Sequence, residues 1–384
     1  MSLEACKKYL RQDSVDGRDN ILDNIRGLVI LLYVLAHFAM SLMGGHYPTA
    51  LNHAYRVGEV RSALGFNIID LAPMAFMFFT GAVIYPVFIR KYEKVGKSAY
   101  RQHLVRNLAL NGLFLLFLTI QDRATRAMTL DIAPYHSLWT FMNDVAVTGI
   151  FMTPFLTKPF REKTWTKFTA GGALILIYAF TRTTLLWYAG TVDAGGGGGI
   201  GACVGFTGIV LLVAGIFDLL RKKEAYFYYA TGGLAVIGAL ALFVFKNFEA
   251  LVSSPEQAQK LIDDADAFGS LWDPRLSIGG AFTASFMIGS LAVFMVFYAL
   301  FYAFNHHVLK DKAIWGLATM GRNLMLYLFL SILLGVIVAF IPLGDAWEEE
   351  RISGGVAIAL TVAVAIGCLA LTIPLYRKKI VFKL

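Results

Sequence analysis

The sequence predicts an all-α integral membrane protein, a polytopic bundle of about ten transmembrane helices. Hydrophobic residues make up 57% of the 384 residues and charged residues only 16%, and the mean hydropathy is +0.62. Soluble domains carry about 25% charged residues. The apolar residues come in blocks of about twenty, the length that a helix needs to cross a bilayer core ~30 Å thick. No block alternates polar and apolar residues as a barrel strand does.

Each apolar block is expected to be helical, because backbone amides in lipid must find their hydrogen-bond partners within the segment. The predicted spans cover residues 23–43, 66–89, 104–121, 137–157, 168–189, 200–220, 226–246, 278–304, 322–342 and 354–376. We expect a leader at 1–22, an outer loop at 247–277 and a tail at 377–384, all in one domain of residues 1–384. The first block lacks a small-residue cleavage site, which argues against a signal peptide.

The distribution of lysine and arginine predicts the orientation of the bundle. With the N-terminus inside, 23 of the 34 basic residues fall in the inner segments, while acidic residues concentrate in the outer ones, as in 256–273 and 345–350. Basic residues are enriched on the cytoplasmic side of membrane proteins. Both termini are therefore expected in the cytoplasm, with the chain in the cell (inner) membrane. This topology also explains the net charge of +8 without a nucleic-acid partner.

Neither a disulfide framework nor a metal site is expected. The cysteines Cys6, Cys203 and Cys368 lie far apart in the chain. Their separation provides no Cys-x-x-Cys motif. The adjacent His306 and His307 have no convergent cysteines or carboxylates in the sequence around them. We predict a protein that functions without a bound metal.

The first predicted span carries two ionisable residues on one face. Arg26 and His37 are eleven positions apart, which is three helical turns plus about 20°, and ~16 Å along the axis. Tyr33 and Ser41 share this face, whereas the opposite face is Leu, Val and Ile. Ionisable groups inside the membrane are costly and usually functional. The alternative is that His37 only forms a hydrogen bond to a neighbouring helix.

Several short motifs resemble the transmembrane acyltransferase superfamily. The Asp-x-x-Arg-Gly opening at 23–27, with ten residues between Arg26 and His37, is most similar to the acyltransferase-3 branch. Residues 70–81 and 321–327 resemble helices of the heparan-alpha-glucosaminide N-acetyltransferases and related proteins, and residues 100–106 resemble the basic entry to the family's third helix. The glucosaminide branch has its catalytic histidine in the first outer loop. There this chain offers His46 and His53, whose flanking residues do not match, so they are reserve candidates.

The resemblance implies transfer of an acyl group from cytoplasmic acyl-CoA, above all acetyl-CoA, to a hydroxyl or amine of a cell-surface carbohydrate or glycolipid. His37 is the expected base, which takes a proton from the attacking acceptor. A transient acyl-histidine is the alternative. Arg26 is assigned to catalysis and, with Arg101, Arg106 and Arg322, to binding the CoA phosphates, which suit the planar guanidinium group.

Other polar residues are expected around the substrate. Asp70 begins the second span, where it would orient the catalytic histidine or hold a sugar hydroxyl; alternatively, it interacts only with the helix N-terminus. Asp144 lies within a predicted span and has Arg182 as its candidate ion-pair partner. The residues expected to line the substrate site are Tyr33, Asn143, Asp144 and His136.

Two other classes of function fit part of the sequence. A transporter or flippase for a lipid-linked or small anionic solute would also place polar residues within ten helices. A scaffold without catalytic activity is a third reading, which the pairing of Arg26 with His37 disfavours. The expected partners are membrane lipids and the carbohydrate acceptor. The sequence leaves open the acceptor, the length of the acyl group, O- or N-transfer and whether the chain forms a homo-oligomer.

Overall fold

The computed structural model is all-α apart from one pair of two-residue strands, over the residues that it describes. These residues are 11–12, 19–43, 71–129, 141–181, 199–251, 284–314, 316–340, 354–378 and 380. The strands β1 (Arg11–Gln12) and β2 (Ala313–Ile314) pair antiparallel.

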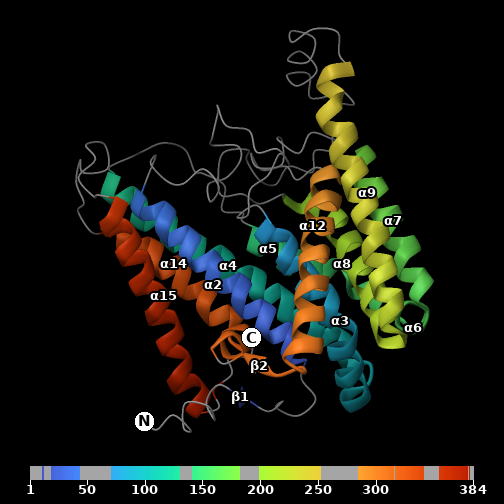
Figure 1. The fold of residues 1–384 in the computed structure, drawn as a ribbon, viewed down its shortest axis with the longest axis horizontal. Helices are drawn as coiled ribbons and strands as arrows, with labels where there is room; N and C mark the ends of the chain where they lie inside the picture. The colour runs from blue at the N-terminus through green and yellow to red at the C-terminus, as the bar shows by residue number, and fades with distance from the viewer. Residues whose placement is uncertain are drawn as a thin grey trace. The chain divides into compact units, whose positions relative to one another are not determined.

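A helix lies in each of the ten apolar segments (Figure 1). The long helices are α2 (Asn20–Met43), α3 (Ala72–Val95), α4 (Ser98–Thr129), α5 (Phe141–Phe151), α7 (Thr164–Thr181), α8 (Gly199–Lys222), α9 (Glu224–Leu251), α12 (Ala284–Ala303), α14 (Leu324–Phe340) and α15 (Gly354–Arg377). The short elements are the 3₁₀ helix η5 (Thr153–Leu156), α6 (Lys158–Glu162), the π-helix η7 (Phe304–Val308) and α13 (Leu317–Arg322).

Among the described residues, four helices are long and apolar enough to cross a membrane. They cover Ala72–Val95, Ile200–Lys222, Met287–Val308 and Ile358–Arg377. Such segments are typical of membrane-spanning helices. The fold is therefore all-α with membrane-type helices, while the number of ten spans and the cytoplasmic position of the termini stay predictions.

Some helices differ in extent from the apolar segments that predict them. The segment 137–157 contains α5, which ends at Phe151, and a separate 3₁₀ turn that includes Pro154. Proline lacks the amide that would continue the helical hydrogen bonds. The sequence predicts a single helix over the segment 322–342. Instead α13 ends at Arg322, Asn323 leaves the helical conformation, and α14 begins at Leu324.

The chain forms two compact units, which we describe separately. Unit 1 comprises Met1–Asn52, Ala124–Leu130 and Phe297–Leu384, and unit 2 comprises His53–Arg123 and Asp131–Val296. The expected single domain of residues 1–384 stays a prediction.

In unit 1, α2 packs against α13, α14 and α15 (Figure 1). Ile25, Ile30 and Val34 of α2 are fully buried. The Tyr327 hydroxyl of α14 donates to the Cys368 carbonyl of α15 over 3.0 Å. On its other side α15 exposes apolar residues such as Ile358. Such a face suits contact with lipid.

In unit 2, α8 is the central helix, packed against α3, α5, α7 and α9. The helices α7 and α8 approach closely where Gly171 faces Gly208. A Cβ on Gly171 would lie only 2.8 Å from the Gly208 carbonyl oxygen. Small residues permit this close approach between membrane helices. Phe78 packs edge-to-face on Phe217 and Phe294, with ring centroids 5.4 and 4.9 Å away. Unit 2 thus has an aromatic core around α8.

Candidate functional site

A polar cluster surrounds the first turn of α2 in unit 1. Asp19 precedes the helix, and its Oδ1 accepts a hydrogen bond of 3.0 Å from the Leu22 amide. An aspartate in this position caps a helix by pairing with an amide that has no partner inside the helix. The polar side chains that follow, Asn20, Asp23 and Asn24, are buried at 7%, 4% and 0% exposure. The helix therefore begins with a polar face turned into the protein.

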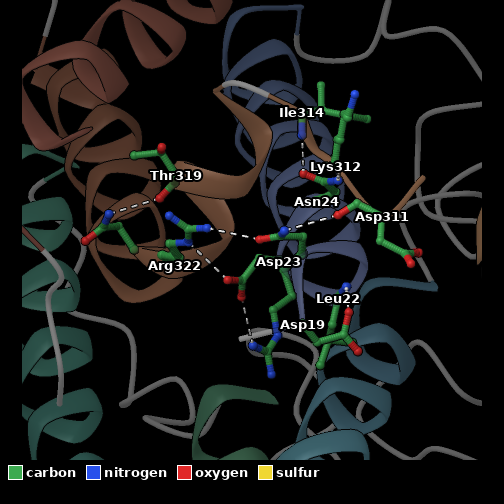
Figure 2. A network of polar contacts seen from close by, with 12 residues as sticks. Asp19, Leu22, Asp23, Asn24, Asp311, Lys312, Ile314, Thr319 and Arg322 are labelled. Carbon is green, nitrogen blue, oxygen red and sulfur yellow. Dashed lines mark hydrogen bonds and ion pairs between the residues drawn. The ribbon is translucent and has the colours of Figure 1, made fainter. Parts of the chain in front are cut away.

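Asp23 joins two arginines that come from distant parts of the chain (Figure 2). The Arg322 Nε donates to Asp23 Oδ2 over 3.1 Å, and the Arg26 Nη1 lies 3.5 Å from Asp23 Oδ1. The side chains of Asp23 and Arg322 are 6% and 7% exposed, and that of Arg26 is 18% exposed. A buried carboxylate needs such partners, since desolvation of an unpaired charge is costly. Of the two arginines, Arg26 is the more accessible.

The two asparagines attach this turn to the segment before α13. Asn24 Nδ2 donates to the Lys312 carbonyl over 3.1 Å, and Asn24 Oδ1 accepts from the Ile314 amide over 2.8 Å. Asn20 Nδ2 donates to the Asp311 carbonyl over 3.1 Å, and its Oδ1 accepts from Arg322 Nη2 over 3.3 Å. Figure 2 shows the Asn24 side chain beside Lys312 and Ile314. The first turn of α2 thus provides hydrogen-bond partners for backbone groups of 311–314 and for the Arg322 guanidinium.

Two glycines allow α2 and α13 to approach closely enough for these contacts. A Cβ on Gly27 would collide with the Leu317 carbonyl, and a Cβ on Gly321 would collide with the Asp23 carbonyl. Both obstacles are backbone atoms, which cannot rotate away as a side chain can. The glycines of the Asp-x-x-Arg-Gly and Gly-Arg-Asn motifs therefore set the distance between the two helices.

The structure brings together part of the predicted site. Arg26 and Arg322 converge on Asp23 in unit 1. Tyr33 lies farther along α2 and is half-buried, and His37 lies in the same helix, although its side chain falls outside the described residues. Asp70 also lies outside the described residues, as do His136, Arg182, His46 and His53.

The predicted residues of unit 2 lie in two different environments. Arg101 and Arg106 are exposed on α4. Asn143 and Asp144 of α5 are fully buried, with Asn143 Nδ2 donating to Asn111 Oδ1 over 2.9 Å. The Cys203 thiol lies 3.7 Å from both the backbone oxygen and Oδ1 of Asp144. A substrate-lining role for Asn143 and Asp144 stays a prediction.

Sequence reasoning missed several polar partners. Asn20 precedes Asp23 by three residues and Asn24 by four, so each of these two shares a helix face with Asn20, which is a signal that the sequence offered. In unit 2, Lys167 is fully buried and forms an ion pair with Asp218. Arg221 also reaches Asp218, at 3.3 Å. The position of Asp218 within the apolar segment 200–220 was the sequence feature that could have predicted this pair.

The described residues contain no group of three histidine, cysteine, aspartate or glutamate side chains that could hold a metal ion. His306 pairs through Nδ1 with Asp311 Oδ1 at 2.8 Å and stacks on Tyr302, with ring centroids 5.6 Å apart. Of the arginines predicted to bind the donor, Arg26 in unit 1 is partly exposed and Arg101 and Arg106 in unit 2 are exposed, so these three can reach an anionic substrate.

These features define an all-α protein with membrane-type helices and a buried cluster of arginine, aspartate and asparagine at the start of α2. No family model matches this chain, and a search of curated proteins finds no match to it. The resemblance to transmembrane acyltransferases therefore depends on the short motifs alone.

Proposed function

We propose that this chain is a membrane-embedded acyltransferase. It moves an acyl group, acetyl above all, from cytoplasmic acyl-CoA to a hydroxyl or amine of a cell-surface carbohydrate or glycolipid. The observation that carries the proposal is the ion-paired cluster of Asp23 with Arg26 and Arg322. It joins two motifs, 23–27 and 321–327, that resemble the same superfamily and lie far apart in the sequence. Functional motifs that meet in space support a common role more strongly than either motif alone.

In this proposal the arginines and His37 have separate tasks. Arg26, which keeps partial exposure, offers its guanidinium group to phosphate oxygens of the donor. Arg322 is almost fully buried and positions Asp23, which in turn orients Arg26. Arg101 and Arg106 supply further exposed cations in unit 2.

His37 takes the proton from the acceptor hydroxyl or amine as its oxygen or nitrogen attacks the thioester carbonyl. The carbon–sulfur bond then breaks, and the CoA thiolate leaves with a proton from solvent or from His37. General-base catalysis of this kind contributes about 10²–10⁴-fold to a rate. We place the reaction in the cell (inner) membrane with both termini cytoplasmic and ten spans, as the distribution of charge predicts.

Binding of acetyl-CoA and CoA to the detergent-purified chain tests the proposal. Arg26→Ala should weaken binding at least tenfold, whereas His37→Ala should retain binding and lose acyl transfer. Lys158→Gln is the control, because Lys158 is exposed and, among the described residues, pairs only with exposed Glu162. Absence of saturable binding by the wild type, with a folded protein shown by its thermal unfolding transition, contradicts the proposal.

A transporter or flippase for an anionic or lipid-linked solute is the second candidate. The observation that favours it is the buried Lys167–Asp218 pair in unit 2, since buried ionisable groups in membrane helices often belong to transport pathways. Solute uptake by reconstituted vesicles without acyl-CoA, abolished by Asp218→Asn but retained by His37→Ala, would select this alternative.

A further inference from the structure

His103 of α4 is held in one tautomer by the backbone of α5. Its Nε2 lies 2.8 Å from the Gly149 carbonyl oxygen. A carbonyl only accepts hydrogen bonds, so Nε2 must carry the proton of the neutral imidazole. Asn107 Nδ2 lies 3.2 Å from the same nitrogen, but it donates to the His103 carbonyl over 2.9 Å. The other ring nitrogen, Nδ1, is then the lone-pair acceptor and has no hydrogen-bond partner within the described part of the chain.

Two cations, Lys91 and Arg106, lie near enough to the His103 ring to act on it. Phe88 of α3 contacts the ring edge-to-face, with centroids 6.2 Å apart. Lys91 follows Phe88 by three residues, and Arg106 follows His103 by three residues, so each shares a helix face with its predecessor. The helices α3 and α4 are joined at Gly96 and Lys97, and they meet where the Phe88 ring contacts Tyr100 and His103. Lys91 therefore lies one turn toward this connection and Arg106 one turn away from it.

The surroundings of the ring contain cations and no carboxylate among the residues that the structure describes. The groups facing it are Phe88 and Lys91 from α3, Arg106 and Asn107 from its own helix, and Gly149 from α5. Burial lowers the pKa of His103, and the charges of Arg106 and Lys91 lower it further. The imidazole is thus neutral at neutral pH, and the charges that act on it are both positive.

We infer that His103, Lys91 and Arg106 form a binding site for a phosphate monoester. The two cations pair with the anionic oxygens, and the phosphate shares one proton with His103 Nδ1. A monoester loses its second proton near pH 6, so the shared proton can reside on either partner. A phosphodiester has no such proton and lacks the second charge, so the site selects monoesters.

This inference rests on the proposed function in one respect. Coenzyme A carries a phosphate monoester, and the site would be where that group binds. A lipid with a monoester headgroup offers the same chemistry. Both sources require the same three side chains, and the experiment must separate them.

The test is titration of the detergent-purified chain with CoA, and with dephospho-CoA, which lacks the monoester, at pH 6, 7 and 8. Since binding takes up a proton, the affinity for CoA should rise by up to about tenfold per pH unit as the pH falls. Dephospho-CoA should bind more weakly and with little pH dependence. Arg106→Gln and Lys91→Gln should each weaken CoA binding about tenfold, whereas Lys158→Gln should not.

His103→Gln separates the binding role from a structural one. Its Nε2 can still donate to the Gly149 carbonyl, so the fold is kept, but it has no group that titrates. The variant should bind CoA with the weak affinity of the wild type at pH 8 at every pH. Equal pH dependence in wild type and variant overturns the inference; if the variant does not fold, a pH-independent wild-type affinity overturns it equally.

Nanodiscs distinguish the two sources of the monoester. In one outcome, phosphatidic acid raises the thermal stability of the wild type more than that of His103→Gln, phosphatidylcholine does not, and CoA does not bind. The ligand is then a lipid headgroup. That result supports the site and contradicts the CoA-dependent function. Conversely, the protein could transfer acyl groups while the pH profile of its KM for acetyl-CoA is the same in wild type and His103→Gln. That result supports the proposed function and overturns the phosphate site.

Discussion

Arg322 and Asp23 are 299 positions apart in the sequence, yet Arg322 Nε donates to Asp23 Oδ2 over 3.1 Å in a site where both side chains are less than a tenth exposed. Arg26 approaches the other oxygen of the same carboxylate. Asp23 is therefore the only carboxylate among the described residues that receives both arginines. Its loss would leave two cations near the start of α2 without their shared partner.

We expect Asp23→Ala to be strongly destabilising. Removing one partner of a buried ion pair costs about 3–5 kcal/mol, because the remaining charge is desolvated and uncompensated. Thermal unfolding in detergent would measure the loss. Glu93→Gln is the matched control, because Glu93 is exposed and should change stability by less than about 0.5 kcal/mol. A double-mutant cycle with Arg322→Met should give a coupling energy of at least about 1 kcal/mol; additive effects would contradict the pairing.

The glycines between α2 and α13 provide a steric prediction. Gly27→Ala and Gly321→Ala each place a Cβ against the backbone of the facing helix, so both should lower the unfolding temperature and displace Asp23 from Arg322. Overpacking typically costs about 1–3 kcal/mol. Gly367→Ala in α15 is the control, since its Cβ would meet no atom within 4 Å. That variant should be neutral or slightly stabilising, as alanine favours helix by about 1 kcal/mol over glycine. Equal effects of all three substitutions would contradict the close contact.

The helices could be predicted from the sequence, but their limits could not. Apolar blocks mark the portion suited to the membrane, whereas a helix continues as long as its backbone hydrogen bonds do. Thus α4 begins at Ser98, six residues before the predicted 104. The prediction began too late because the first turns of α4 carry polar side chains such as Arg101 and Gln102. Hydropathy alone does not detect such turns.

The candidate site could be predicted only in part, for a related reason. The spacing of Arg26 and His37 is a property of one helix, and the sequence contains it. The pairing of Asp23 with Arg322 depends on how α2 packs on α13, which no local pattern specifies. Asn24 was missed because its two hydrogen bonds go to backbone atoms of 312 and 314, which any sequence would offer.

The surroundings of His103 predict a dependence of stability on pH. Burial and the neighbouring cations hold its pKa below the ordinary 6.5, so the folded protein binds a proton there less readily than the unfolded chain. The contribution of His103 to the free energy of unfolding is fully present above pH 6.5. It falls as the pH drops through the lowered pKa, with a slope of at most about 1.4 kcal/mol per pH unit. Unfolding in phosphate-free buffer between pH 8 and 5 would measure it. His103→Gln should flatten this component, whereas exposed His307→Gln should leave it unchanged.

The buried ion pair of unit 2 predicts an asymmetry between its two partners. Lys167 is fully buried, and Asp218 is its only carboxylate partner among the described residues, whereas Asp218 also has Arg221 at 3.3 Å. Asp218→Asn therefore leaves Lys167 desolvated without an opposite charge, although its ammonium group still lies 4.0 Å from the centre of the Tyr85 ring. Lys167→Met leaves Asp218 with one cation and places an apolar side chain in a buried position.

We expect Asp218→Asn to cost about 3 kcal/mol or more and Lys167→Met to cost clearly less, because loss of one partner is most damaging when the other cannot reach solvent or a second counterion. Chemical unfolding of both variants would measure the difference. The exposed pair of Lys158 and Glu162 is the control, since such a pair contributes at most about 0.5 kcal/mol. If Lys167→Met were the more damaging change, Lys167 would owe its position to packing around Tyr85 and not to the charge of Asp218.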